Sequence, residues 1–168
     1  MKHLIITVIG NDRPGLVDTL SDTVYQHQGN WLSSSLSKLA GQFAGIVQVE
    51  VADQNSAALR QALNTIDGLQ VQIVEEATTT ATHTTLHGLL VTGNDRAGIV
   101  KEVTAKLHEL GININKLKTD SHSAPNWGYP IFTADFQLEL PAFLTLEQVQ
   151  ETLENLADDL TIDIDQDE

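Results

Sequence analysis

An internal repeat is the feature that most limits how this chain can fold. Gly10–Val17 reads Gly-Asn-Asp-Arg-Pro-Gly-Leu-Val, and Gly93–Val100 repeats it 83 residues later with Ala for Pro and Ile for Leu. Six of the eight positions are identical. Self-similarity at about half the length of a 168-residue chain indicates two copies of one small domain.

Both copies predict the same order of secondary structure. A β-branched apolar run before the turn is typical of a buried strand, and apolar residues at helical spacing follow the turn. A glycine, Gly29 or Gly111, then ends the first helix as a left-handed residue. The expected strands lie at residues 4–9, 31–39, 43–52, 69–74, 86–92, 112–121, 131–140 and 160–164, and the expected second helices at residues 57–66 and 146–156.

Two capping patterns mark the starts of the second helices. Asn55 or Ser56 is the expected N-cap in the first copy. Thr145, with Gln148 three residues later, forms an expected capping box in the second copy.

The order βαββαβ, found twice, predicts an α+β protein with two ferredoxin-like domains. Each domain has a four-stranded antiparallel sheet with both helices on one face. We expect the domains at residues 1–76 and 85–168, with an extended linker at residues 77–84. Because such a sheet leaves its other face or its edges open, we also expect the two copies to pack against each other.

The composition favours a globular protein that does not bind nucleic acid directly. Hydrophobic residues make up 41% of the chain, which is enough for a core. Nine basic and 23 acidic residues give a net charge of -14, which disfavours contact with DNA phosphates and anionic membranes. The absence of cysteine excludes disulfides and thiolate chemistry. The N-terminal stretch is too short for a signal or membrane-spanning segment, so we expect a cytoplasmic protein.

The repeated turn has the chemistry to hold a small zwitterion. A turn between a strand and a helix presents backbone N–H groups at the positive end of the helix dipole, where carboxylates and phosphates bind. Gly15 and Gly98 allow close approach of a ligand. Asp12 and Asp95 are candidate acceptors for an ammonium group, and the preceding asparagines offer a donor and an acceptor. The alternative is plain turn chemistry, in which Asp caps the helix and Arg is solvated.

The sequence around the turn resembles the ACT domain, a family of small-molecule regulatory modules. Asp12–Val17 matches the family pattern aspartate-arginine-proline-glycine-aliphatic-valine, and Asp95–Val100 matches it with alanine for proline. The family often continues with glycine-x-asparagine-isoleucine, as in Gly111–Ile114, whereas Trp31 stands where the first copy should have the asparagine. The resemblance covers essentially the whole chain, and the arrangement is similar to the glycine cleavage system transcriptional repressor family of tandem ACT proteins.

This resemblance implies an amino-acid sensor that regulates transcription. ACT domains usually bind amino acids at interfaces between paired domains, through the first turn and the start of the second strand. The resemblance therefore implies a small amino-acid ligand, with glycine as the first expectation, a DNA-binding partner protein, and dimerisation as a further option. The half at residues 77–168 has a net charge of -10, against -4 for residues 1–76, and is the hypothesised docking surface for a basic partner. The expected ligand-binding residues are Asn11, Asp12, Gly15, Leu16, Asn94, Asp95, Gly98, Ile99 and Asn113.

Two other functions remain open. The chain can be a ligand-independent protein-interaction module with a vestigial pocket. A lower alternative is an acylphosphatase-like hydrolase, because Arg13 and Arg96 follow a first turn in the same topology. The glycine-rich loop of that family is missing, and two modules leave no room for a separate catalytic domain. We therefore expect no catalytic residue, no cofactor and no metal.

The remaining polar and aromatic segments have structural explanations. None of the six histidines has metal-ligand spacing, and Ser33–Ser35 fits strand alternation better than a nucleophile elbow. Trp31 and Trp127 are expected in packing or at an interface. The loop His122–Pro130 can cover a ligand, contact a partner or fold over its own sheet, and the acidic C-terminus is most simply solvated.

Overall fold

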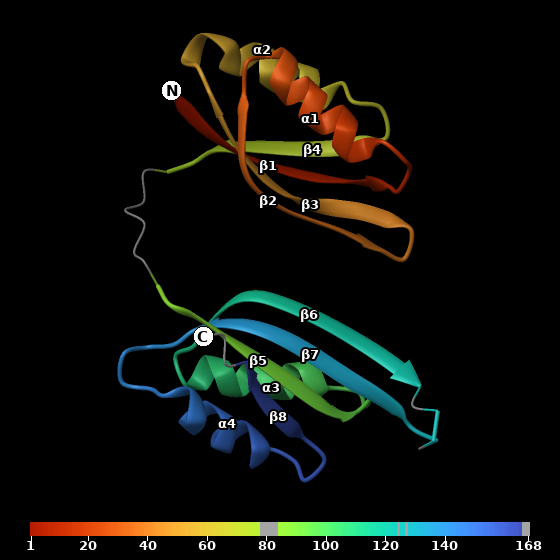
Figure 1. Cartoon of the computed structure of the whole chain (residues 1–168), viewed down its shortest axis with the longest axis vertical. Coiled ribbons are helices and arrows are strands. Elements are labelled where there is room, and N and C mark those ends of the chain that lie inside the picture. The colour runs from red at the N-terminus through yellow and green to blue at the C-terminus, as the bar shows by residue number, and fades with distance from the viewer. Residues whose placement is uncertain (78–83, 124, 127, 166–168) are drawn as a thin grey trace. The chain divides into compact units, whose positions relative to one another are not determined.

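A computed structural model describes residues 1–77, 84–123, 125–126 and 128–165. The chain divides into two compact units, Met1–Ala81 and Thr82–Glu168, called unit 1 and unit 2 below (Figure 1). Residues 78–83 of the expected linker lie outside the described residues, as do Trp127 and the last three residues of the acidic C-terminus.

Unit 1 has one sheet and two helices. Its elements are β1 (Lys2–Asn11), α1 (Leu16–Gln26), β2 (Asn30–Leu39), β3 (Gln42–Val51), α2 (Asp53–Asn64) and β4 (Leu69–Glu75). The strand order is β2-β3-β1-β4, and all pairs are antiparallel.

Unit 2 repeats this arrangement. Its elements are β5 (Leu86–Asn94), α3 (Ile99–Glu109), β6 (Asn113–Ser123), β7 (Pro130–Glu139), α4 (Leu146–Glu154) and β8 (Thr161–Asp165). The strand order β6-β7-β5-β8 is the same, again fully antiparallel. The predicted fold class, two ferredoxin-like βαββαβ units, is confirmed.

In each unit the helices cover one face of the sheet and form the core with it (Figure 1). Along β1, Leu4, Ile6 and Val8 are buried, because alternate side chains of a strand point to the same face. The apolar stripe of α1 packs on that face through Leu16, Leu20 and Val24. Unit 2 has the equivalent buried stripe on α3, with Ile99, Val103 and Leu107.

The faces away from the helices differ between the units. Strand alternation and register place serines and glutamines around isoleucine and valine in unit 1, but lysines and aspartates in unit 2. The unit 1 face carries Ile5, Ile9, Ser33, Ser35, Ile46, Gln48, Gln70, Gln72 and Val74. The unit 2 face carries Leu90, Lys116, Lys118, Asp120, Asp135, Asp163 and Asp165.

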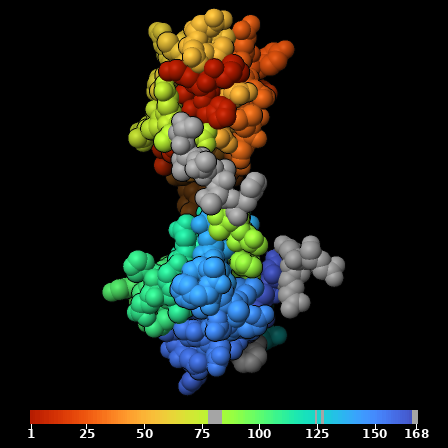
Figure 2. Space-filling view, turned by 90° about the vertical axis from the view of Figure 1, so that its left-hand side faces the viewer, coloured from red at the N-terminus to blue at the C-terminus, as the bar shows by residue number. Residues whose placement is uncertain are grey.

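The start of α2 differs from the sequence prediction. The helix begins at Asp53 with Ala52 as its N-cap and no side-chain cap, so neither Asn55 nor Ser56 is the cap. Ser56 lies inside the helix and is only 3% exposed. The Met1 ammonium instead pairs with Asp53 in the first turn at 3.0 Å, at the surface of unit 1, where the N-terminal residues are red in Figure 2. In unit 2 the predicted capping box of Thr145 is present.

The end of α1 corrects the predicted role of Gly29. The left-handed residue after the helix is Gln28, with φ 57°, at the position that Gly111 fills in unit 2 with φ 75°. Gly29 is instead required by packing, because a Cβ there would lie 2.8 Å from Val24 Cγ1. Asn30 is therefore the equivalent of Asn113, and each pairs with a glutamate of the neighbouring strand. The first copy thus has the second-strand asparagine, and Trp31 does not replace it.

No helix among the described residues is both long and apolar enough to span a membrane.

Candidate functional site

Two glycines shape the turn after β1 for different reasons. A Cβ on Gly10 would lie 2.1 Å from the Gly68 carbonyl oxygen, so glycine lets β1 approach the start of β4. Gly15 has φ 85° and precedes α1, and nothing lies within 4 Å of its Cβ position. Its carbonyl oxygen accepts hydrogen bonds from the Thr19 N–H and hydroxyl, both at 2.9 Å. Gly15 is thus required by backbone conformation, and the space above it is open.

The turn of unit 2 is built in the same way. A Cβ on Gly93 would lie 2.8 Å from Leu160 Cδ2. Gly98 has φ 89°, and its carbonyl oxygen accepts from the Glu102 N–H at 3.0 Å. The shared backbone geometry accounts for the glycines of both copies without a ligand.

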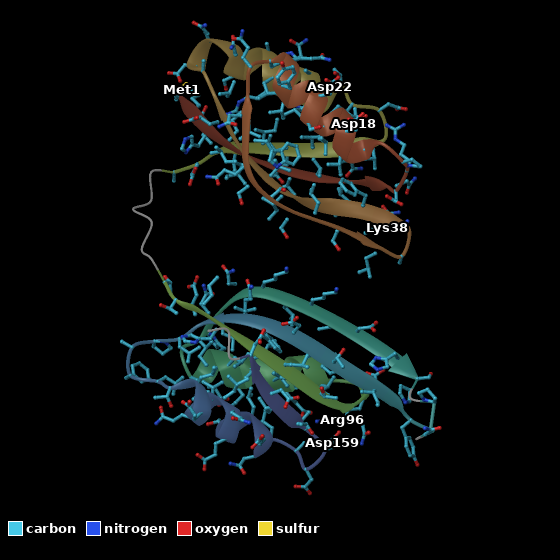
Figure 3. All side chains as sticks on the ribbon, in the orientation of Figure 1. Met1, Asp18, Asp22, Lys38, Arg96 and Asp159 are labelled. Carbon is cyan, nitrogen blue, oxygen red and sulfur yellow. The ribbon has the colours of Figure 1, made fainter. Side chains whose placement is uncertain are left out.

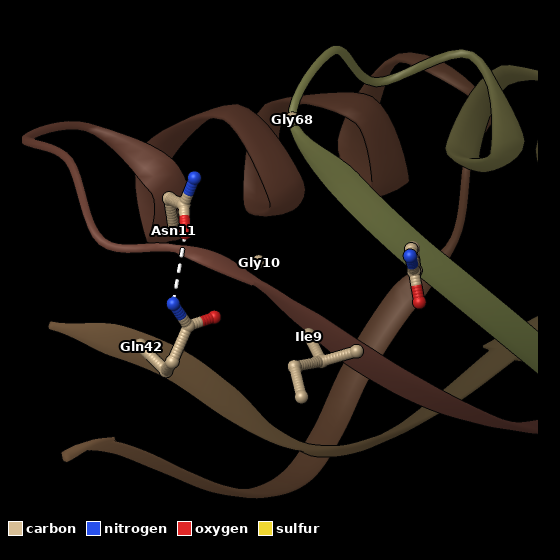
Figure 4. A pocket seen from close by; sticks show the side chains of 6 residues that line it. Ile9, Gly10, Asn11, Gln42 and Gly68 are labelled. Carbon is tan, nitrogen blue, oxygen red and sulfur yellow. Dashed lines mark hydrogen bonds between the residues drawn. The ribbon is translucent and has the colours of Figure 1, made fainter. Parts of the chain in front are cut away.

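Asn11 lines a surface hollow of about 260 Å³ at the end of β1 (Figure 4). We call it the β1 hollow, and its lining residues are Ile9, Gly10, Asn11, Gln42, Gly68 and Gln70. The Gln42 amide nitrogen donates to Asn11 Oδ1 at 2.8 Å across β1 and β3. Three side-chain amides thus offer both donors and acceptors to a small polar molecule.

The aspartates of the turn already have partners. Asp12 pairs with Lys38 at 2.7 Å, and its backbone N–H donates to the Gly41 carbonyl. Asp95 accepts from the Ser121 hydroxyl at 2.7 Å, at the equivalent position of β6. The Lys38 side chain is 66% exposed, so an ammonium group from a ligand competes with a solvated partner at Asp12.

The two arginines of the repeat have different partners. Arg13 donates from Nη2 to the Asp67 carbonyl oxygen at 2.5 Å. Arg96 instead forms a bidentate pair with Glu102 at 2.8 and 2.7 Å. These hydrogen bonds raise the pKa of Arg96 and lower that of Glu102.

A carboxylate of unit 2 also reaches the end of β5. The Asn94 N–H donates to Asp159 Oδ2 at 3.1 Å. Figure 3 labels Arg96 and Asp159 near the start of α3, and the charge of Asp159 contributes to the raised pKa of Arg96.

Three of the predicted ligand-binding residues are placed away from an open site. Leu16 and Ile99 are each 3% exposed and belong to the cores, so only their backbone groups are near the turns. Asn113 donates to Glu139 at 3.1 Å and shares a row of the sheet with Leu86, at the opposite end of β5 from Asn94. At 3.3 Å per residue, that separation is about 26 Å. Within unit 2, Asn113 is therefore not brought to the turn.

A second hollow of about 420 Å³ lies between α1 and the start of β2. Asp18 and Asp22, labelled on α1 in Figure 3, line it together with Tyr25 and Trp31. Trp31 also packs partly against the core, in agreement with its predicted packing role. Among the described residues, no group of three or more histidines and acids can hold a metal ion.

Sequence reasoning missed several residues of the candidate site. Arg13 and Arg96 were considered only for the hydrolase alternative and not as residues that bind an amino acid, although their presence in both copies was an available signal. Gln42, Gly68 and Asp159 belong to parts of the chain that do not repeat, and only strand pairing brings them to the turn.

Comparisons with known proteins identify similar sequences and folds. Residues 2–74 match the family model of the ACT domain. The crystal structure of an unknown protein from Galdieria sulphuraria is 29% identical, with a TM-score of 0.84, and the match covers 97% of this chain and 96% of that one. The crystal structure of a candidate glycine cleavage system transcriptional repressor is 18% identical, with a TM-score of 0.71 and coverage of 99% and 98%, and shares the fold. No curated protein sequence is significantly similar to the chain.

Proposed function

We propose a regulatory function for this chain, whose residues 2–74 match the ACT domain and whose second unit has the same ferredoxin-like fold. In this proposal the protein binds a small amino acid at the turn after β1 and signals its presence to a partner protein in the cytoplasm. The supporting observation is the β1 hollow, which is lined by three side-chain amides and lies next to the turn. Gly10 and Gly15 allow the backbone conformation of this turn.

The chemistry of the β1 hollow suits a small zwitterion. Beside the hollow, backbone N–H groups of the turn and the Arg13 guanidinium, which lies next to Gly68, are donors for a carboxylate. The side-chain oxygens of Gln42 and Gln70 in its lining are acceptors for an ammonium group. The Asp12 carboxylate in the adjoining turn is a further acceptor, in competition with Lys38. A hollow of about 260 Å³ favours a small amino acid, and glycine is the first ligand to test.

Regulation follows if the ligand binds one arrangement of the protein better than another. The ligand can change the binding of the partner protein only by its difference in affinity for the two arrangements. The free energy that couples two binding sites is typically about 1–3 kcal/mol. The chain is acidic, with a net charge of -14, so it is suited to contact a basic protein rather than DNA. We therefore propose that transcriptional control, including that of glycine cleavage, runs through a DNA-binding partner protein docked on unit 2.

This proposal assigns the chain no enzymatic role. The hydrolase alternative requires an arginine that is available to a phosphate; Arg96 is held by Glu102 in a bidentate pair, which leaves Arg13 as the arginine of the repeat to test. Measurable acyl-phosphate turnover that is lost in Arg13→Ala would overturn this part of the proposal.

Calorimetric titration of the full chain with a panel of amino acids tests ligand binding. We expect at least one small amino acid, glycine first, to bind below millimolar concentration. Absence of heat with every amino acid at millimolar concentration would leave the ligand-independent interaction module as the better explanation. A gel-shift assay with operator DNA checks the partner, because the chain alone should not shift DNA at physiological salt.

A further inference from the structure

The two copies of the turn differ in the carboxylates that surround them. We propose that unit 1 alone has an open carboxylate-binding site, formed by the Asn11 N–H and the Arg13 guanidinium beside Gly68, whereas unit 2 fills the same place with its own Asp159 and Glu102. This inference deepens the proposed function, on which it rests for the identity of the ligand as an amino acid.

Strand pairing makes Gly68 and Asp159 equivalent. In unit 1, Gly10 pairs with Leu69, so the next residue, Asn11, faces Gly68. In unit 2, Thr92 pairs with Thr161, so Asn94, two residues later, faces Asp159. The close contacts agree, because Gly10 approaches Gly68 and Leu69 while Gly93 approaches Leu160 and the Asp159 carbonyl.

In unit 2 a carboxylate stands at this position. Asp159 Oδ2 accepts from the Asn94 N–H at 3.1 Å, and the negative charge of Asp159 helps to raise the pKa of Arg96. In unit 1 the residue at this register position, Gly68, has no side chain. A Cβ built on Gly68 would lie 3.8 Å from Arg13 Cζ and 3.9 Å from Nη2, which is ordinary contact distance. A carboxylate beside Gly68 would therefore meet the guanidinium and the Asn11 N–H.

The second difference is the partner of the arginine. Glu102 holds Arg96 through two hydrogen bonds at 2.8 and 2.7 Å. The equivalent residue of unit 1 is Thr19, whose hydroxyl donates to the Gly15 carbonyl and carries no charge. Within the part of the chain that the structure describes, Arg13 has no carboxylate partner, and it donates to the Asp67 carbonyl from Nη2. An arginine has five N–H donors, so Arg13 keeps donors for a second acceptor.

Both differences leave unit 1 with fewer carboxylates around the turn than unit 2. Unit 2 supplies two carboxylates of its own, and unit 1 has a glycine and a threonine at those positions. The β1 hollow, lined by Asn11 and Gly68, is the space that an external carboxylate would enter in unit 1. The ligand class is therefore a small molecule with a carboxylate, and the expected stoichiometry is one ligand per chain.

Acetate is the first probe, because it carries a carboxylate and no ammonium group. In NMR spectra of the isotope-labelled full chain, sodium acetate should shift the Asn11 amide and the Arg13 Nε–H. The Asn94 amide and the Arg96 Nε–H should not move, and sodium chloride at matched ionic strength is the control. Equal shifts in the two units, or none at Asn11, would overturn the inference.

Two substitutions of Gly68 test whether unit 1 binds an external carboxylate because it has no carboxylate of its own at this position. Gly68→Asp introduces a carboxylate beside the Arg13 guanidinium, and Gly68→Asn is the uncharged control of equal size. Both place a side chain at φ 77°, which aspartate and asparagine tolerate better than most residues. We expect acetate binding to weaken by about tenfold or more in Gly68→Asp and to change by only about twofold in Gly68→Asn. The same affinity in both variants would contradict the inference.

The reverse change tests the occupancy of unit 2. The double variant Asp159→Gly/Glu102→Thr gives unit 2 the residues of unit 1, and acetate should then shift the Asn94 amide. The control Asp159→Asn/Glu102→Gln keeps the shapes of both side chains, and it should respond less. If acetate does not shift the Asn94 amide in the folded double variant, the carboxylates of Asp159 and Glu102 are not what prevents acetate binding in unit 2.

Titration with glycine and the other amino acids separates this inference from the proposed function. If no amino acid binds while acetate shifts Asn11 and Arg13, amino-acid sensing is refuted and the carboxylate site stands. If an amino acid binds without moving either signal, this inference is refuted and the sensing function stands.

Discussion

Gly10 and Gly15 stand five residues apart in one turn, yet substitution to alanine should have very different effects. In Gly15→Ala the added Cβ meets nothing within 4 Å, so the penalty is only the left-handed conformation at φ 85°. That conformation costs about 1–2 kcal/mol for a residue with a Cβ. In Gly10→Ala the Cβ would lie 2.1 Å from the Gly68 carbonyl oxygen, which is backbone and cannot rotate away. The strands must separate, and overpacking of this kind costs about 3 kcal/mol or more.

Urea unfolding of unit 1 measures this difference. The chain has two tryptophans, so a Trp127→Phe background leaves Trp31 as the only one, and its fluorescence reports on unit 1. A small domain loses about 1 kcal/mol of stability per molar urea. We therefore expect the urea midpoint to fall by about 1–2 M in Gly15→Ala. In Gly10→Ala it should fall by about 3 M, or unit 1 should be unfolded even without urea.

Gly41→Ala is the matched control, because Gly41 has φ 80° and also has nothing within 4 Å of its Cβ position. Its midpoint should fall by about as much as that of Gly15→Ala. If Gly10→Ala is no less stable than Gly15→Ala, the close approach of β1 to Gly68 is not a constraint on this turn, and the reasoning is refuted.

Three further predictions concern positions outside the turn. The hydrogen bond between His3 and Glu50, with help from Glu76, raises the pKa of His3 above its ordinary value of 6.5. Protonated His3 therefore stabilises unit 1 fully below pH 6.5, and this stabilisation is lost as the pH rises through the raised pKa. The fall in urea midpoint of unit 1 from about pH 6 to about pH 8 should therefore be smaller in His3→Gln. Gln28→Gly should stabilise unit 1 by about 1 kcal/mol, since Gln28 has φ 57°, and an unchanged or lower urea midpoint would contradict this. Thr145→Ala removes the capping box of α4 and should destabilise unit 2 by about 1 kcal/mol in thermal unfolding, with Thr145→Ser close to wild type.

The sequence predicted the fold well because its signals are local. Alternation in β1 and helical spacing in α1 are set by residues a few positions apart, and the repeat doubled every signal. Predictions were less accurate where one residue decides a helix end. Gln28, the residue after the C-cap of α1, takes the left-handed position that Gly29 was expected to fill. Gly29 is instead a site of close packing, against Val24. A Cβ on Gly29 would also lie 3.1 Å from Val49 Cγ1 of β3, and an approach across elements leaves no local pattern.

The candidate site also has one part that depends on neighbours in the sequence and another that depends on tertiary contacts. The sequence by itself determined the repeated turn, with its glycines, its asparagines and its acidic and basic residues, because these are neighbours in the chain. Only the tertiary structure decided what surrounds each turn. Antiparallel pairing brings Gly68 to Asn11 and Asp159 to Asn94, across more than fifty residues in each unit. Two turns that are nearly identical in sequence therefore have different electrostatic surroundings, because charges act through space and not along the chain.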